Sequence, residues 1–386
     1  MGHSSNKKKK SGKRKPVNLM PSYTSKFAKL EASNDATPPP SIHSCVFPSN
    51  EEMSLGDFHM HSTCSDGKYR PSQVIQKAFE NGVVYLSLTD HDTMAGVQEA
   101  MEKAMELGIF VIPGVEISAE EKGAENMHIL GYFCPGTESK EIEDQLLLIR
   151  QARHHRGQEM LRKLATMGIH LDWERVLEIA GEAAPGRPHV AQALVEAGHV
   201  ANFRDAFARY LGNDGPAYAE GEHFPPQEAI KMIAQAGGIS VLAHPWCCKN
   251  PLDVVPKLAA AGIHGLEVYH DTNKIDMYGA LARESSLLKL GGSDFHGIDP
   301  TTEREPGNIP LPRKHLDAFL ERAKEIWALP LRNKVKTICE SLQDKPETLV
   351  TWSELVSIVQ EETQEHQDIL IEISTNKHYS HITFHR

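Results

Sequence analysis

The stretch that decides the fold is VVYLSLTDHD, residues 83–92, in which a short apolar run leads directly into the polar side chains Asp90, His91 and Asp92. Its first seven residues, 83–89, are mostly apolar or β-branched, which predicts a buried strand. A helical pattern follows over residues 94–107. The unit before it has the same order, with a strand predicted at 55–60 and a helix at 71–81. Repeated strand-helix units are typical of a mostly parallel sheet in an α/β fold.

The alternation of strands and helices is interrupted once along the chain. Strands are predicted at 109–115 and 127–133, and residues 139–235 then read as mostly helical. We interpret this helical stretch as a subdomain inserted at one end of an α/β barrel. Its predicted helices are 141–164, 173–180, 189–197, 203–210 and 226–236. The alternation resumes with predicted strands at 239–243, 265–268 and 287–290, separated by helices at 251–261 and 275–284.

Five segments follow from this pattern. Residues 1–50 are polar, with a lysine run and three consecutive prolines, so we expect a disordered basic arm. Residues 51–138 and 237–312 form the two parts of the barrel, and 139–236 form the inserted helical subdomain. Residues 313–386 are predicted to be a helical extension of unknown role, with His378, His381 and His385 on the surface or disordered.

Charge and composition limit the class of protein. The net charge is −11, yet residues 1–16 hold seven Lys and Arg side chains and no acid. This arm either is a nuclear localisation signal or a nucleic-acid-binding tether, or it is simply a solvated tail. No apolar run approaches the roughly 18 residues that a membrane span needs, and no secretory h-region is present. We therefore expect an intracellular protein, in the cytoplasm or nucleus, without membrane contact. The sequence predicts no particular protein partner.

Potential metal ligands occur at or near the end of every predicted strand. His59 and His61 are two residues apart, so on a strand both imidazoles face the same side. The carboxyl ends of parallel strands are where α/β barrels carry their active sites, so these side chains should converge. The nine candidates are His59, His61, Asp66, His91, Glu116, His128, His244, Asp294 and His296.

Nine ligands exceed the needs of one ion, since a catalytic ion takes three or four protein ligands and keeps an open position. Shared through a bridging Glu116, they predict two or three divalent ions. Imidazole and carboxylate without thiolate favours Mn²⁺, Zn²⁺ or Fe²⁺, with Mg²⁺ a further choice, over Ca²⁺ or Cu⁺. Clustered divalent ions are suited to phosphoryl chemistry, because they activate water and neutralise charge on phosphate oxygens.

The strand-end motifs resemble those of the PHP family, named for polymerase and histidinol phosphatase. The matching motifs are His59-Met60-His61, Ser65-Asp66-Gly67, Thr89-Asp90-His91-Asp92, Gly114-Val115-Glu116, His128, Ala243-His244-Pro245 and Gly292-Ser293-Asp294-Phe295-His296. The resemblance covers about residues 55–311 and implies a distorted (β/α)7 TIM-like barrel with three metals. The implied ligand sets are His59, His61, Glu116 and Asp294 for one ion, Glu116, His128 and His244 for the second, and Asp66, His91 and His296 for the third.

Within the family, the helical insertion and the motif Gly186-Arg187-Pro188-His189 resemble the branch that acts on nucleotides. That branch includes 3′,5′-bisphosphonucleoside phosphatases and 5′→3′ exonucleases of short RNA. The resemblance therefore predicts an enzyme, a metal-dependent phosphoric ester hydrolase that acts on a nucleotide or short RNA. One alternative is a phosphatase of another small phosphomonoester such as histidinol phosphate. A second is a non-catalytic nucleic-acid-binding module.

The predicted reaction is attack on phosphorus by a hydroxide that bridges the metals. The residues assigned to catalysis are Asp66, His91, Glu116, His270 and Asp294, with His270 either a proton donor or a hydrogen-bonding support. The residues assigned to substrate are Arg187, His189 and Tyr218. Arg187 is predicted to bind phosphate, His189 to contact substrate or cap a helix, and Tyr218 to stack on a base or pack in the core. Asp90 and Asp92 are expected to orient His91 or to shape the turn, with Asp92 also a helix-cap candidate. Arg150, Arg153 and Arg156 form a basic helical face that is either solvated or steers an anionic substrate.

Overall fold

The computed structural model describes residue 53 and the ranges 55–120, 126–137, 140–181, 183–212, 215–219, 224–270, 272–298, 300 and 303–386. The predicted basic arm, residues 1–50, lies outside the described residues. No helix among the described ones is both long and apolar enough to cross a membrane.

Seven strands form one sheet in chain order, and the sheet is nearly closed into a barrel. The strands are β1 (Gly56–Asp57), β2 (Tyr85–Leu88), β3 (Phe110–Glu120), β4 (Asn126–Tyr132), β5 (Ile239–Leu242), β6 (Gly265–Tyr269) and β7 (Leu288–Gly291). The first and last strands approach each other: Phe58 N donates to Gly291 O over 3.2 Å, and His61 N to Phe295 O over 2.8 Å. The predicted distorted (β/α)7 barrel is confirmed. Much of its distortion lies in β4, which runs antiparallel to both β3 and β5.

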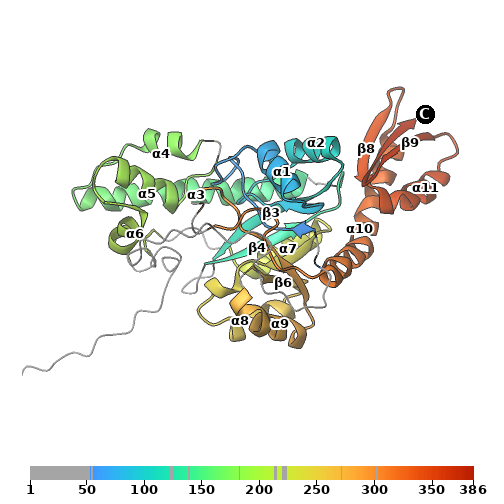
Figure 1. Cartoon of the computed structure of the whole chain (residues 1–386). Helices are drawn as coiled ribbons and strands as arrows, with labels where there is room; N and C mark the ends of the chain where they lie inside the picture. The colour runs from blue at the N-terminus through green and yellow to red at the C-terminus, as the bar shows by residue number, and fades with distance from the viewer. Residues whose placement is uncertain are drawn as a thin grey trace, which may run out of the picture.

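Amphipathic helices cover the outside of this sheet (Figure 1). The barrel helices are α1 (Pro71–Glu80), α2 (Val97–Leu107), α7 (Pro226–Gln235), α8 (Pro251–Ala260) and α9 (Ile275–Glu284). Pro71 opens α1, where its missing N–H costs no hydrogen bond. Gly108 ends α2 with φ of 68°, a left-handed conformation that glycine adopts without strain. The proline and the glycine thus place the start of α1 and the end of α2 close to the predicted positions.

The inserted helices have a hydrophobic core of their own. They are α3 (Lys140–Thr166), α4 (Trp173–Ala180), α5 (Arg187–Glu196) and α6 (Phe203–Ala206), and a π-helical turn over Phe207–Leu211 continues α6. This second core runs from Met160 to Ala219, whereas Ile142, Leu146 and Ile149 of α3 join the barrel core. The predicted insertion, 139–236, was therefore too wide. Helix α7 belongs to the barrel, because Ala229, Ile230 and Ile233 pack in its core.

The C-terminal extension is not wholly helical, and the prediction for 313–386 was wrong on this point. After α10 (Arg313–Ser341) come β8 (Glu347–Trp352), α11 (Val356–Gln364), β9 (Leu370–Asn376) and β10 (Tyr379–His385), and the strands form an antiparallel sheet in the order β8-β10-β9. The error arose because β9 is largely exposed and its sequence is polar, so it lacks the apolar run of a buried strand.

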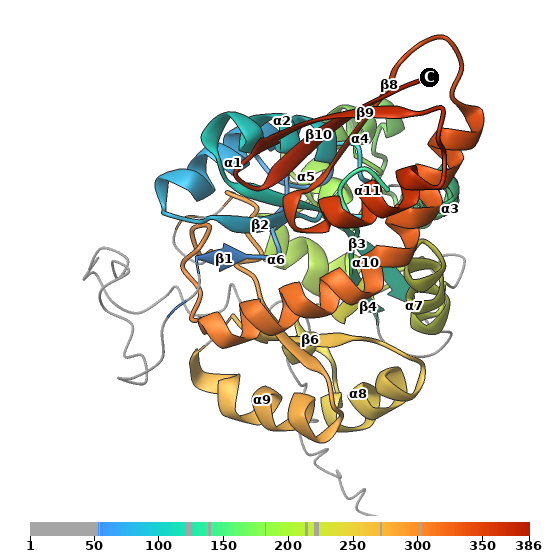
Figure 2. The same cartoon turned by 90° about the vertical axis from the view of Figure 1, so that its right-hand side faces the viewer.

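This extension packs against the barrel rather than standing apart (Figure 2). The Tyr379 hydroxyl bonds both the N–H and the carbonyl of Val111, over 2.8 and 3.0 Å. Trp352 stacks on Phe110 with ring centroids 5.5 Å apart, and His378 lies half-buried against the same ring. Phe110 and Val111 begin β3, so the extension covers the end of the sheet where the parallel strands start.

Candidate metal centre

All nine predicted ligands come together at one edge of the barrel. His59, His61 and Asp66 follow β1, His91 follows β2, and Asp294 and His296 follow β7, as expected for carboxyl strand ends. Two ligands occupy positions that the sequence pattern did not predict. Glu116 lies within β3, which continues to Glu120, and His128 lies near the start of β4. Because β4 is reversed, its start reaches the edge where the parallel strands end.

Glu116 is the centre of the cluster, fully buried and surrounded by imidazoles. Its Oε1 lies 2.9 Å from both His128 Nδ1 and His244 Nε2. Its Oε2 lies 3.2 Å from the Nε2 atoms of His59 and His61 and 3.1 Å from His91 Nδ1. One carboxylate thus faces five imidazole nitrogens, two on one oxygen and three on the other. This is the arrangement required of a ligand that bridges ions.

Asp66 and Asp294 complete two further donor groups. Asp294 Oδ1 lies 3.4 Å from the Nε2 atoms of both His59 and His61. Asp66 Oδ1 lies 3.3 Å from His296 Nε2, and its Oδ2 lies 3.6 Å from His91 Nε2. The donor atoms form three sets, and within each set all of them lie within 4.8 Å of one another. The sets are His61, Asp66, His91 and His296; His59, His61 and Asp294; and His91, Glu116 and His128.

These sets resemble the ligand sets implied by the family but do not coincide with them. His91 faces Glu116 through Nδ1 and Asp66 through Nε2, so it lies between two groups. His61 likewise contributes to two groups. His244 stays close to its expected partners, since its Nε2 is 3.1 Å from His128 Nδ1. The division of the nine ligands among individual ions therefore stays a prediction.

Unsatisfied buried atoms test whether the cluster fits metal ions. Within the described part of the chain, several buried site atoms have no hydrogen-bond partner. They are His59 Nε2, His61 Nε2, Asp66 Oδ1, His91 Nδ1 and Glu116 Oε2. Buried polar atoms normally pair, and leaving one unpaired costs about 1–3 kcal/mol. Five such atoms, converging from β3 and from the segments after β1 and β2 with only nitrogen and carboxylate donors, fit divalent ions of the Mn²⁺, Zn²⁺ or Fe²⁺ type.

Backbone strain at two ligands supports the same conclusion. His244 has φ of 28° and Asp294 has φ of 53°, both in the left-handed region that non-glycine residues rarely adopt. Such strain persists only where surrounding structure enforces it, and it concentrates at functional sites. Gly292 allows the close approach at this point, because a Cβ there would lie 2.2 Å from His59 Cβ.

The carboxylates and the imidazoles of the cluster shift one another's pKa values. Burial alone would lower the pKa of His59, but the carboxylates of Glu116, Glu267 and Asp294 raise it well above its usual value. Burial would raise the pKa of Glu116, yet the facing imidazoles hold it well below its usual range. His91 differs, since its burial outweighs the nearby carboxylates and lowers its pKa to about 3. A neutral His91 has a free lone pair for a metal ion.

Second-layer contacts hold the ligands in place. Glu267 Oε1 lies 3.3 Å from His59 Nδ1, and its Oε2 accepts from His244 N over 2.6 Å. Asp90 accepts from Ser62 and Ser65, whose hydroxyl is 3.4 Å from His61 Nδ1. Of the two roles expected for Asp90, these hydrogen bonds favour shaping the loop, here the His61 loop, over orienting His91. Such outer contacts fix the orientation of metal-binding histidines.

Asp92 connects the ligand loop to the inserted helices. Its carboxylate accepts from Ser118 N over 2.7 Å and from Arg153 over 2.5 Å, and Arg150 donates to its carbonyl. The prediction that Asp92 caps the next helix was wrong, because α2 begins at Val97 with Gly96 as its cap. The basic face of α3 is therefore turned toward the site. The spacing of Arg150, Arg153 and Arg156, three residues apart, was the available signal.

The predicted substrate residues lie on the inserted subdomain. Arg187 opens α5, and its guanidinium carbon lies 5.9 Å from the ring centroids of both Phe207 and Tyr218. His189 is buried, and its Nδ1 accepts from Gly186 N over 2.9 Å. This bond caps the N-terminus of α5, the second of the two roles predicted for His189. The Tyr218 hydroxyl donates to Glu120 over 2.6 Å, and its pKa rises to about 12 through burial and that bond.

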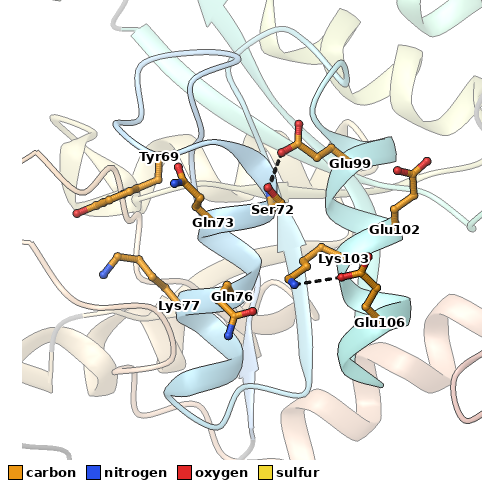
Figure 3. Close-up of a pocket in the computed structure, with 9 residues that line it drawn as sticks. All are labelled: Tyr69, Ser72, Gln73, Gln76, Lys77, Glu99, Glu102, Lys103 and Glu106. Atoms are coloured by element: carbon orange, nitrogen blue, oxygen red, sulfur yellow. Dashed lines mark hydrogen bonds and ion pairs between the residues drawn. The ribbon is translucent and has the colours of Figure 1, made fainter.

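His270, the predicted proton donor, follows β6 at the same edge. Its Nδ1 bonds the carbonyl of Gly292 over 2.9 Å, and its ring stacks on Trp246 at a centroid distance of 4.7 Å. A separate surface pocket of about 600 Å³ lies between α1 and α2 (Figure 3). Its lining includes Ser72 and Glu99 but none of the nine ligands, so it is distinct from the metal centre.

Comparison with known proteins agrees with this geometry. The PHP domain pattern matches residues 57–210. A relative named 5′-3′ exoribonuclease, from Haemophilus influenzae, is 38% identical over 253 residues, which span 62% of this chain and 89% of the relative. The chain belongs to the PHP family. A 3′,5′-nucleoside bisphosphate phosphatase of Chromobacterium violaceum is 32% identical over 252 residues, 63% of this PHP chain and 88% of the relative.

A solved structure matches the PHP barrel as well. It is a candidate metal-dependent phosphoesterase from Bifidobacterium adolescentis, similar with a TM-score of 0.61 and 28% sequence identity. The match covers 70% of this chain and 97% of that chain. Nearly all of the compared protein is thus represented here, while about a third of this PHP chain lies outside the match.

Proposed function

We propose that this PHP protein is a metal-dependent phosphoesterase that hydrolyses phosphate esters of nucleotides or short RNA. The observation that carries the proposal is the nine-donor cluster around buried Glu116. The relatives named for exoribonuclease and nucleoside bisphosphate phosphatase activity favour a nucleotide substrate. We propose two or three divalent ions, with Mn²⁺ favoured and Zn²⁺, Fe²⁺ or Mg²⁺ as the other choices.

When bound, the ions would supply a nucleophilic water at neutral pH and neutralise charge on the phosphate oxygens. Glu116, with the histidines on both of its oxygens, would hold neighbouring ions together. Asp66 and Asp294 would supply further carboxylate ligands next to the same histidines. Full burial of Glu116, His59 and His61 keeps bulk water from the centre of the site, which strengthens the charge interactions there.

Two further residues would act on the substrate directly. His270 donates its Nδ1–H to the Gly292 carbonyl, which leaves Nε2 to deliver a proton to the leaving oxygen when the ring is charged. The stack with Trp246 fixes the plane of that ring. Arg187, held over two aromatic rings, would bind phosphate oxygens through its planar fork of N–H donors.

The alternatives are weaker for specific reasons. A non-catalytic binding module is disfavoured because no position of the predicted ligand set is vacant. A phosphatase of another small phosphomonoester, such as histidinol phosphate, would use the same metal centre. The inserted subdomain with Arg187 at its edge favours the larger nucleotide substrate over that alternative.

The test is Mn²⁺-dependent phosphate release from adenosine 3′,5′-bisphosphate, beside 5′-mononucleotide release from a short 5′-phosphorylated RNA. Asp294→Ala removes a proposed ligand, and Asp317→Ala, an exposed change on α10, is the matched control. We expect metal-dependent turnover of at least one substrate, lost in Asp294→Ala and kept in Asp317→Ala. Turnover of neither substrate by metal-loaded protein would overturn the nucleotide assignment, and a panel of phosphomonoesters would follow.

A further inference from the structure

The three-stranded sheet of the C-terminal extension is covered on one edge only. Its order is β8-β10-β9, so β8 and β9 are the outer strands. The barrel lies against β8, since Cys134 Sγ is 3.7 Å from Thr351 Oγ1. A Cβ on Gly136 would collide with the Val350 carbonyl of the same strand. Within the described part of the chain, β9 pairs with no strand other than β10, so its outer side can accept a further strand.

Strand β9 lacks the features that normally protect the edge of a sheet. Protected edge strands are often very short, interrupted by a bulge, or rich in lysine or proline. The seven residues of β9, LIEISTN, include neither lysine nor proline, and their pairing with β10 continues without a bulge from end to end. Two of its apolar side chains are exposed, Leu370 to 73% and Ile373 to 36%. This combination favours pairing with the strand of another chain.

The apolar layer of the extension stops abruptly at β9. Leu349 of β8, Ile382 of β10 and Ile373 of β9 lie directly opposite one another in the paired strands. Leu349 and Ile382 are buried, whereas Ile373 keeps more than a third of its surface in water. Directly opposite side chains on paired strands lie about 4.5–5.5 Å apart and pack together. A strand with an apolar residue at its centre would therefore continue this row and cover Ile373.

The β9 strand of a second copy has this character. Antiparallel pairing centred on Ile373 places that residue opposite its own equivalent, and it places Glu372 opposite the partner's Ser374. Centring the pair on Glu372 instead would bring two carboxylates face to face, which is unfavourable. The register centred on Ile373 also brings Lys377, exposed in the turn after β9, next to the partner's Asp368. The strand is thus complementary to itself in both apolar side chains and charge.

We propose that two copies of this chain associate through antiparallel pairing of their β9 strands, which joins the two three-stranded sheets into one. Such an interface is isologous, as in most symmetric dimers. The extension packs against the strand starts of the barrel, so both metal centres stay open. Because two seven-residue strands bury a small area, the dimer is weak and depends on concentration. The inference does not depend on the proposed activity.

The test measures the mass of the full chain by sedimentation equilibrium over a roughly hundredfold range of concentration. The wild type should change from monomer to dimer across this range. Ser374→Glu places a second carboxylate opposite the partner's Glu372, twice in each dimer, and should weaken association roughly 2- to 30-fold. Ser374→Lys places an ammonium group there instead and should strengthen association by a similar factor. Because Ser374 is exposed, both variants should fold.

Two further variants test the centre of the interface. Ile373→Lys should remain a monomer at every concentration. Leu252→Lys makes a comparable change at an exposed side chain of α8 and should associate as the wild type does. If Ile373→Lys does not fold, the opposite responses of the two Ser374 variants decide.

Three results would overturn the proposal. The first is a wild type that remains monomeric throughout. The second is a monomer in which hydrogen exchange shows the outer amides of β9 to be protected, which would assign this edge to a segment of the same chain. The third is a dimer in which Ser374→Glu and Ser374→Lys behave alike, because its interface would then lie elsewhere.

Discussion

Replacing Glu116 with glutamine should disable the metal centre more completely than any other single change of similar size. The amide keeps one acceptor oxygen but turns an NH₂ group toward either two or three imidazole nitrogens, and it removes the charge. A unit charge about 3 Å from a cation is worth about 5 kcal/mol at an effective dielectric near 20. Half of that would weaken metal binding roughly 70-fold.

We therefore expect Glu116→Gln to lower Mn²⁺ affinity by about 70-fold, and kcat/KM at least about 1,000-fold once the lost rate effect of the ions is included. Metal content measured by mass spectrometry after dialysis, together with phosphate release, provides the two readouts. Thermal unfolding of the variant should remain cooperative, which would separate loss of metal from loss of fold.

Glu267→Gln is the matched comparison, because Glu267 supports His59 and His244 without being among the predicted ligands. Loss of such an outer partner typically costs about 10- to 100-fold in affinity or activity. The reasoning would be refuted if the two variants lost metal and activity equally, or if Glu116→Gln kept a full complement of metal. Either result would mean that Glu116 shapes the site without bridging ions.

Two further predictions concern stability away from the metal centre. Glu99 of α2 accepts hydrogen bonds from Arg70 and Ser72, which hold its pKa at about 2. Figure 3 shows the contact with Ser72, which joins α2 to α1. Because the pKa of Glu99 is lower in the folded state, its contribution to stability is present above pH 4.5 and is lost as the pH falls toward 2. Glu99→Gln should lower the free energy of unfolding by roughly 1–2 kcal/mol near pH 7 after allowance for solvent screening. In urea unfolding, the difference between variant and wild type should vanish at low pH. Tyr379→Phe removes the hydroxyl that bonds the Val111 N–H and carbonyl, so it should lower the free energy of unfolding by about 1–3 kcal/mol in the same urea assay. We expect kcat to stay unchanged. A fall in kcat would contradict the separation of the extension from the site.

The barrel strands could be predicted because each carries a signal that is local in the sequence. The run at 83–89 became β2, and the strands predicted at 265–268 and 287–290 became β6 and β7 with small shifts at the ends. Each of these strands is short, apolar and followed by a polar turn. The donor side chains next to them were found for the same reason, since His91 and Asp294 stand directly after such runs.

Features that depend on pairing between distant segments could not be predicted in this way. The reversal of β4 is set by its hydrogen bonds to β3 and β5, and no residue within 127–133 encodes it. The contact between Arg153 and Asp92 joins α3 to a loop 61 residues earlier in the chain. The extension strands were missed because a polar, exposed strand such as β9 takes its conformation from its neighbour β10.

Helix α3 explains how an insertion with its own core can present arginines accurately to the metal centre. Its first half packs into the barrel through Leu146 and Ile149, and its second half packs into the inserted core through Met160 and Leu164. The middle of the helix, which holds Arg153, therefore has no freedom to tilt away from the ligand loops. A helix anchored in two cores is a rigid support, and the loops that carry the metal ligands need rigid support of this kind. On the opposite edge, the extension packs against the starts of the strands, where it can stabilise the barrel without entering the site.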